Sequence, residues 1–256
     1  MAACSSYRQD STLRPFPPMY MVEGERDIDS LLSDVKELPS LSTVLSMLEE
    51  GKMLDVKVLK LLLWVLSGGP SQLQLRTLNK IEAAEVLSLA DTANHPPPSY
   101  VMAVTTTSSS RWMTDTREKR TFWAFHGSRL DNFHSILHYG LQQHRTKVCM
   151  RNEDHLNNVK KFIQVSLFGE GIYLSEDLGV CLAYSSRGVG WTRSMLGNSV
   201  SCLALAQVLD HPSVKLHTED RERGAVEGSE GGRVPDKYIV VRNNELLHIR
   251  LDQHHQ

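Results

Sequence analysis

The chain has 256 residues, of which 41% are hydrophobic and 23% are charged, so it can bury a core as one large domain or two small ones. Its 28 basic and 30 acidic residues give a formal net charge of -2, and no block of like charge forms a tail. This balance argues against a nucleic-acid-binding protein, and we expect no nucleic-acid partner.

Cysteine usage and hydropathy indicate the compartment. Four cysteines are scattered without a Cys-x-x-Cys pair, which is typical of a reducing compartment rather than of a disulfide scaffold. The N-terminus has no apolar core like that of a signal peptide. The longest apolar run, residues 58–66, contains Lys60 and is far shorter than the ~20 residues that span a bilayer. We therefore expect a soluble chain that faces the cytosol.

The first third of the chain has the apolar spacing of amphipathic helices. Four helices are expected, at residues 28–38, 41–48, 55–64 and 77–89. Asp27 is placed to cap the first of them. The third is apolar on most faces, which predicts the central helix of a small bundle.

A proline-rich segment separates a part of the chain with helix-like patterns from a part with strand-like patterns. Three consecutive prolines in residues 92–99 (TANHPPPS) exclude a helix interior or a central strand, so we place a domain boundary near residue 95. Strand-like stretches follow at residues 121–125, 171–174, 200–209, 238–241 and 248–251. Strands with few helices between them favour an α+β domain over a doubly wound sheet. The expected division is a small α-helical domain, 1–94, followed by an α+β domain, 95–256.

The first candidate site lies in FWAFHGSRL, residues 122–130, between a strand and a helix-like run. Binding pockets often form at such a junction between a strand and a helix. His126 offers ring nitrogens for hydrogen bonding, and Gly127 lets the backbone approach a ligand. By itself His126 is equally well explained as a histidine that packs and hydrogen-bonds locally.

A second candidate is SLFGEGIYLSEDLGVCLAYS, residues 166–185. It fails as a dinucleotide fingerprint, because Leu174 occupies the third glycine position and a strand follows where a helix belongs. Its two glycines would instead let the backbone approach a flat ligand. Tyr173 and Tyr184 would then sandwich a planar ring across a slot. Either tyrosine alone is more simply explained by core packing.

Three segments in this order are specific: HGS, then GxGIYL with a second tyrosine downstream, then a late KYIVV strand at residues 237–241. Together they resemble the catalytic domain of the poly(ADP-ribose) polymerase family, which has the diphtheria-toxin-like ADP-ribosyltransferase fold. LRPFP, SLFGEG, SEGG and NNELL extend the resemblance to a member anchored in the endoplasmic reticulum, whose helical domain the N-terminal helices resemble. The resemblance spans nearly the whole chain.

The resemblance implies that NAD is the cofactor and the ADP-ribose donor. It assigns His126 a hydrogen bond from an imidazole N–H to a ribose hydroxyl. Gly127 would hold the nicotinamide carboxamide through its backbone, and Ser128 completes the cofactor-binding motif. Tyr173 and Tyr184 would stack on the nicotinamide ring. Holding NAD in a distorted shape would lower the barrier to cleavage of the nicotinamide–ribose bond.

Two departures from the family refine the expected activity. Polymer-forming members carry a glutamate on the last strand, whereas Lys237 or Tyr238 stands in that region here. The resemblance favours Tyr238, which gives a catalytic set of His126, Tyr173 and Tyr238, and transfer of one ADP-ribose without elongation. Cys181 replaces a family serine, which weakens one hydrogen bond to nicotinamide.

Residues 145–164 look like an insertion in the loop that lids the NAD site, and we expect the helical domain to dock beside this loop and to influence activity. Histidines near the insertion raise the question of a metal. The possible ligands are His134, His138, His144, Cys149 and His155. Their spacing is irregular and includes no paired cysteines, so we expect no metal site.

Three functions remain open. The first is a protein mono-ADP-ribosyltransferase that modifies acceptor proteins, including itself. The second is an inactive module that binds NAD or ADP-ribose, and the third is an RNA phosphate-removing relative, which the neutral charge disfavours. Retention of His126, Tyr173 and Tyr184 favours the enzyme. A place at the endoplasmic reticulum or nuclear envelope, and a role in the unfolded protein response, are implied by the resemblance alone, since the chain ends at Gln256 without the anchor.

Overall fold

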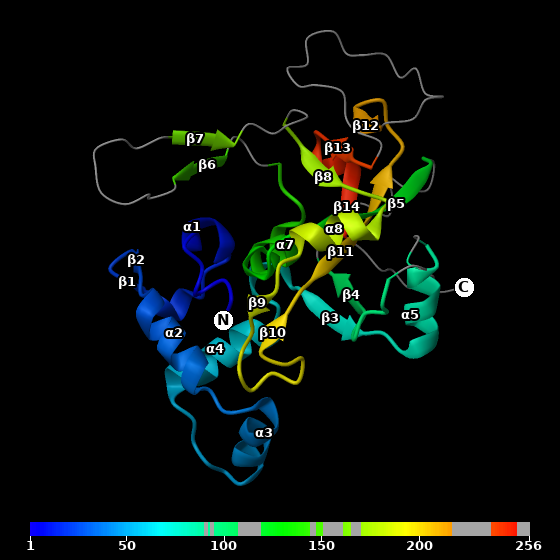
Figure 1. The fold of residues 1–256 in the computed structure, drawn as a ribbon. Helices are drawn as coiled ribbons and strands as arrows, with labels where there is room; N and C mark the ends of the chain where they lie inside the picture. The colour runs from blue at the N-terminus through cyan, green and yellow to red at the C-terminus, as the bar shows by residue number, and fades with distance from the viewer. Residues whose placement is uncertain are drawn as a thin grey trace.

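The structure is a computed structural model that describes residues 1–89, 92, 95–106, 119–143, 147–150, 161–164, 170–216 and 237–249. Helices dominate the N-terminal part and antiparallel strands the remainder, in agreement with the mixed α+β class expected from the sequence (Figure 1).

Three of the four expected helices begin within one residue of their predicted starts, and the fourth begins later, at Lys80, because Thr77 belongs to the strand β3 (Gln74–Thr77). The elements are α1 (Gln9–Thr12), the 3-10 helix η1 (Pro18–Tyr20), the strand pair β1 (Met21–Val22) and β2 (Glu25–Arg26), α2 (Ile28–Glu37), α3 (Leu41–Glu49), α4 (Val56–Leu66), the 3-10 helix η2 (Gly69–Ser71) and α5 (Lys80–Leu87). Side-chain oxygens of Asp27, Ser40, Asp55 and Asn79 accept the first backbone N–H groups of α2, α3, α4 and α5. All four expected helices are therefore confirmed, including the Asp27 cap.

Tyr20 lies at the centre of the N-terminal core. Its ring is fully buried together with Leu31 and Leu61. The phenol donates a hydrogen bond to Oδ2 of Asp34 at 2.7 Å, and burial and this bond together raise the pKa of Tyr20. The ammonium group of Lys57 lies 4.2 Å from the ring centre. These contacts tie η1 to both α2 and α4.

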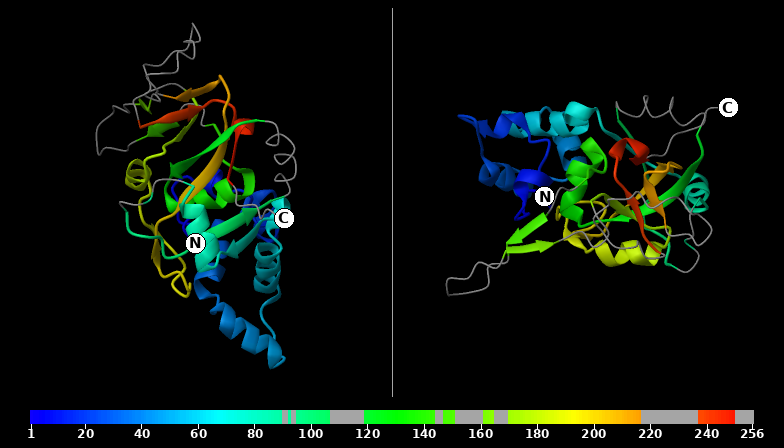
Figure 2. Two further views of the ribbon diagram at one scale, coloured as in Figure 1. Left: turned by 90° about the vertical axis from the view of Figure 1, so that its right-hand side faces the viewer. Right: turned by 90° about the horizontal axis from the view of Figure 1, so that it is seen from above.

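The expected central position of α4 is wrong. Leu61 and Leu62 are buried, but Leu63 is 60% exposed and Leu66 is 71% exposed. The reason is that α3 projects away from the rest of the molecule in both Figure 1 and Figure 2, so α4 has packing partners on one side only. An apolar face is present in the sequence, but this small unit supplies too few neighbours to cover it.

Two three-stranded antiparallel sheets form the second part of the chain. One has the order β14 (Leu247–Ile249), β11 (Leu203–Leu209), β5 (Thr121–Gly127), and the other the order β12 (Val214–Leu216), β13 (Ile239–Val241), β8 (Ile172–Leu174). Phe125 and Ser175 join them by two backbone hydrogen bonds of 2.7 and 2.9 Å. Ala206 of β11 and Leu174 of β8 lie in one hydrophobic cluster. The two sheets thus share a core.

A further strand pair crosses the expected domain boundary. β3 (Gln74–Thr77) pairs with β4 (Met102–Thr105), and Leu78, Val86 and Ala103 form a small core against Leu205 of β11. The segment from β3 to α5 therefore packs with the sheet-containing part. The division of the chain at 94/95 stays a prediction.

The N-terminal helices dock on α7 (Phe133–Tyr139), which lies between them and the sheets (Figure 1). Nε2 of His134 donates a hydrogen bond to the carbonyl oxygen of Pro15 at 2.8 Å. The Ser71 hydroxyl bonds Nδ1 of His138 at 2.6 Å. The Trp64 ring centre lies 6.3 Å from the centres of both imidazoles. The N-terminal helices therefore pack on the second part of the chain through α7, whereas the expected place beside the 145–164 loop and the expected influence on activity stay predictions.

The remaining strands form two hairpins. β6 (Lys147–Met150) pairs with β7 (Lys161–Gln164), and β9 (Gly188–Val189) pairs with β10 (Ser199–Val200). The other residues of the expected 145–164 insertion, with His144 and His155, lie outside the described residues. Within the described ranges, none of the helices has the length and hydropathy to span a bilayer, and no group of three or more histidine, cysteine or acidic side chains is placed to share a metal ion.

Candidate active site

His126 lies on β5, and its ring reaches β8. Nδ1 is 2.9 Å from the backbone oxygen of Tyr173. Because a carbonyl oxygen only accepts, Nδ1 must carry the proton in this bond. A neutral imidazole in this tautomer has its lone pair on Nε2. The geometry thus joins two of the predicted site residues, and it fixes which ring nitrogen is the donor.

Gly127 is required by the close approach of α8 (Leu178–Tyr184) to β5. A Cβ at this position would lie 2.0 Å from the carbonyl oxygen of Cys181. The Cys181 thiol is buried and donates to the carbonyl oxygen of Phe125 at 3.2 Å. Burial raises the pKa of Cys181 to about 11, so the sulfur stays protonated near neutral pH. Gly127 and Cys181 therefore form one joint between β5 and α8.

The glycine before β8 has a different role from the one expected. A Cβ on Gly171 would meet Cγ1 of Val240 at 2.5 Å. The space beside Gly171 is therefore filled by β13, and the glycine serves strand packing rather than close approach to a flat ligand. Gly169, its partner in the motif, lies outside the described residues.

Tyr173, Tyr184 and Tyr238 lie on β8, at the end of α8 and immediately before β13, and the last two are in contact. Tyr173 on β8 is opposite Val240 of β13 in the strand register. Tyr184 ends α8, and its hydroxyl lies 3.2 Å from that of Tyr238, the residue preceding β13. The hydrogen bond with Tyr184, followed by burial, raises the pKa of Tyr238. Tyr238 is therefore a neutral phenol near neutral pH.

Lys237 points to a different partner. Its ammonium group forms an ion pair with Oδ2 of Asp177 at 2.7 Å, and this interaction raises the pKa of Lys237. Asp177 in turn accepts the N–H groups of Gly179 and Val180 at the start of α8. Of the two residues considered for the glutamate position, Tyr238 is the one whose side chain meets another predicted site residue.

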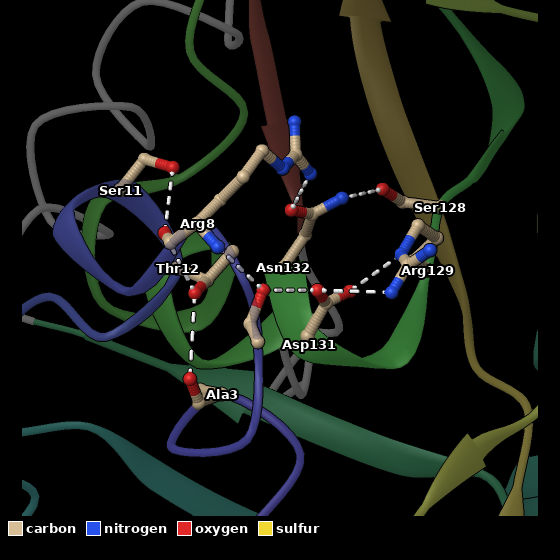
Figure 3. Close-up of polar contacts among 9 residues, drawn as sticks. Ala3, Arg8, Ser11, Thr12, Ser128, Arg129, Asp131 and Asn132 are labelled. Atoms are coloured by element: carbon tan, nitrogen blue, oxygen red, sulfur yellow. Dashed lines mark hydrogen bonds and ion pairs between the residues drawn. The ribbon is translucent and has the colours of Figure 1, made fainter. Parts of the chain in front are cut away.

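Ser128 has a partner that the sequence prediction missed. Nδ2 of Asn132 donates to the Ser128 hydroxyl oxygen at 2.7 Å (Figure 3). Asn132 ends the 3-10 helix η3 (Leu130–Asn132). The signal available in the sequence was a polar residue only four positions after Ser128, within reach across a short turn.

A cavity in the described part of the chain lies elsewhere. It has a volume of about 220 Å³ and is lined by Ile136 and Tyr139 of α7 and by His248 of β14, among others. None of the predicted site residues lines it. The predicted site residues instead make two contacts among β5, β8, α8 and the start of β13, from His126 to the backbone of Tyr173 and from Tyr184 to Tyr238.

Comparison with known proteins identifies the family of the chain. Residues 99–245 match the poly(ADP-ribose) polymerase catalytic domain, and residues 1–66 match the ARTD15 N-terminal domain. The chain is 36% identical to protein mono-ADP-ribosyltransferase PARP16 of Mus musculus and 35% identical to that of Homo sapiens. Each alignment covers 97% of this chain and 74% of the relative. The family model covers more than half of the chain, and with these identities it shows that the chain belongs to the poly(ADP-ribose) polymerase family.

Proposed function

We propose that the chain is a protein mono-ADP-ribosyltransferase, which moves one ADP-ribose unit from NAD to a protein side chain and releases nicotinamide. The observation that carries this proposal is the contact between the Tyr184 and Tyr238 hydroxyls, 3.2 Å apart. It supports Tyr238 as the residue in the place of the polymerases' glutamate. Both similar proteins are named mono-ADP-ribosyltransferases.

The nicotinamide end of NAD would bind at the junction of β5 and α8. Tyr173 and Tyr184 would supply flat faces for the ring, and the backbone of Gly127 would bond the carboxamide. The Cys181 thiol is directed at Phe125, so it would offer the carboxamide less than a serine hydroxyl does.

His126 would contact a ribose hydroxyl. Since Nδ1–H is engaged with Tyr173, the neutral imidazole would accept the hydroxyl hydrogen at Nε2, instead of donating from N–H as expected from the sequence. This bond would orient the ribose and raise the electron density on its oxygen. Positive charge that develops on the ribose ring would thereby be stabilised.

The reaction breaks the bond between ribose C1′ and the nicotinamide nitrogen, and the bonding electron pair leaves with nicotinamide. A side chain of the acceptor protein then forms a bond to C1′ and loses a proton. This first transfer requires mainly a held cofactor and a nearby nucleophile. Elongation requires in addition a base for a ribose hydroxyl, and a neutral phenol such as Tyr238 is a poor base near neutral pH.

Labelling with NAD tests the function. Incubation of the chain with NAD, followed by mass spectrometry of the intact protein, should show additions of single ADP-ribose units together with released nicotinamide. NAD binding without nicotinamide release over hours would favour the inactive binding module instead. A ladder of units on one side chain, lost on substitution of His126, would contradict the argument from Tyr238.

The detailed fold type and the cellular location rest on the resemblance to the poly(ADP-ribose) polymerase family. We infer the diphtheria-toxin-like form of the ADP-ribosyltransferase fold, supported by two small sheets joined between Phe125 and Ser175. A cytosol-facing location at the endoplasmic reticulum, and acceptors that include the chain itself, stay predictions.

A further inference from the structure

The N-terminal segment reaches the HGS motif through a chain of side chains. Nη2 of Arg8 donates to Oδ1 of Asn132 at 2.8 Å, and Nδ2 of Asn132 donates to Oγ of Ser128 at 2.7 Å (Figure 3). Arg8 and Asn132 are 124 positions apart in the sequence. A residue of the helical part is thus two hydrogen bonds away from the predicted cofactor-binding motif.

Arg8 determines the orientation of the Asn132 amide. A guanidinium group only donates, so the amide oxygen must face Arg8 and the amide nitrogen must face Ser128. Ser128 Oγ is then an acceptor in this bond, and its own hydrogen is directed to a group other than Asn132. With the amide reversed, the amide oxygen would face Ser128 and take that hydrogen. Arg8 therefore decides whether the Ser128 hydroxyl can donate elsewhere.

A second set of contacts fixes the same segment on the other side of Ser128. The Ser6 hydroxyl donates to Oδ2 of Asp131 at 2.6 Å, and each of these residues is only 5% exposed. Asp131 also forms an ion pair with Arg129, 3.1 Å between Oδ1 and Nε. Burial opposes ionisation of Asp131, but the bonds from Ser6 and Arg129 outweigh it and hold the pKa of Asp131 below its ordinary value.

The two sets are connected, because the backbone N–H of Arg8 donates to Oγ of Ser6 at 3.2 Å. Nε of Arg8 is buried and has no hydrogen-bond partner among the described residues. An unpaired buried donor costs stability, so the position of Arg8 is not the most stable one for a guanidinium group alone.

We propose that Arg8 is a positioning residue for NAD, which acts through Asn132 to keep the Ser128 hydroxyl available as a hydrogen-bond donor to the cofactor. The inference rests on the proposed function and adds a residue of the helical part to its substrate-binding apparatus. The N-terminal segment then sets the affinity for NAD without touching it.

Arg8→Met tests the proposal in the whole 256-residue chain, because methionine keeps an apolar stem and removes every side-chain donor. KM for NAD should rise about three- to tenfold, the effect of one lost hydrogen bond, while kcat changes less than about twofold. The dissociation constant of a non-cleavable NAD analogue, measured by calorimetry, should rise by the same factor. Arg8→Lys keeps one donor and should restore part of the affinity.

Ser71→Ala is the matched control, because it removes a side-chain bond across the same contact, to His138 of α7, that does not lead to Ser128. It should leave KM unchanged. An equal rise in KM for Ser71→Ala and Arg8→Met would overturn the proposal in favour of general loosening of the contact. The melting temperatures of all variants show which of them fold, and Arg8→Lys carries the test if Arg8→Met does not.

The most discriminating test is whether the effect of Arg8 on NAD binding depends on Ser128. Asn132→Asp keeps the acceptor for Arg8 but loses the donor to Ser128, so it should raise KM as Arg8→Met does. In a Ser128→Ala background, Arg8→Met should have little further effect on analogue binding. An undiminished effect there refutes the route through Ser128. If the wild-type chain does not bind the analogue, the proposed function is refuted and this inference with it. If the wild-type chain binds the analogue and Arg8→Met binds it equally well, only this inference is refuted.

Discussion

Gly127→Ala gives the most direct test of the site geometry. The added Cβ would lie 2.0 Å from the carbonyl oxygen, 2.7 Å from the carbonyl carbon and 3.0 Å from Cα of Cys181. These are backbone atoms, so no rotamer change relieves the clash. Helix α8 must move back by about 1 Å, which carries Tyr184 with it, and a displacement of this size can cost about 100-fold in rate. Overpacking at such a joint typically costs about 1–3 kcal/mol of stability.

The assay is NAD-dependent labelling under single-turnover conditions, with thermal unfolding measured in parallel. Labelling by the folded variant should fall at least tenfold, since a tenfold loss corresponds to ~1.4 kcal/mol of transition-state stabilisation. Gly51→Ala is the matched control: Gly51 has φ +70° with nothing within 4 Å of a Cβ, so it adds backbone strain of about 1 kcal/mol far from the site. Wild-type labelling by folded Gly127→Ala would refute the assignment of the β5–α8 joint as the pocket.

Three further predictions follow from the same contacts. His126→Ala and Tyr173→Ala should each reduce labelling at least about tenfold in folded protein, and wild-type rates for both would remove them from the site. Tyr238→Phe should still give single additions by intact-mass analysis, because no proton transfer is assigned to the phenol; complete loss of labelling would contradict this. Burial lowers the pKa of His138 from 6.5 to about 4. As the pH drops from 6.5 towards 4, the unfolded chain therefore binds a proton at this residue before the folded chain does, and the melting temperature should fall. His138→Gln should flatten this dependence.

Structural features that depend on residues close together in the sequence were predicted correctly. Asp27 caps α2 as a side-chain acceptor, as expected, an effect confined to one turn of chain. Strands were found at the five expected places for the same reason, since each is a short apolar stretch bounded by turn residues, although the last two residues of the expected 248–251 strand lie outside the described residues. The neighbours against which those elements pack were harder to predict from the sequence. Helix α4 was expected to be central, but it is half exposed because α3 turns away from it.

The site was predictable only in part. The resemblance placed His126, Tyr173, Tyr184 and Tyr238 in one site, and this stays a prediction. The structure forms two contacts among them, from the His126 ring to the backbone oxygen of Tyr173 and between the hydroxyls of Tyr184 and Tyr238. Spacing alone assigned Gly171 to a ligand, although it makes room for Val240. That error arose because the partner strand lies almost 70 residues later, and local sequence does not encode which neighbour fills a glycine's space.

Three consecutive residues of β5 explain how the site is held before any ligand arrives. Phe125 bonds the backbone of Ser175 beside β8, the His126 ring bonds the backbone oxygen of Tyr173, and Gly127 lies against the backbone of Cys181 in α8. All three contacts reach main-chain atoms, which have no rotamers to change. Groups fixed in this way need no reorganisation when charge develops on the ribose, which is the condition for strong electrostatic stabilisation of a transition state. The hydroxyl of Ser128, next in sequence, is instead oriented by side chains alone, through Asn132 and Arg8, and this makes it the member of the HGS motif that is open to adjustment from the helical part of the chain.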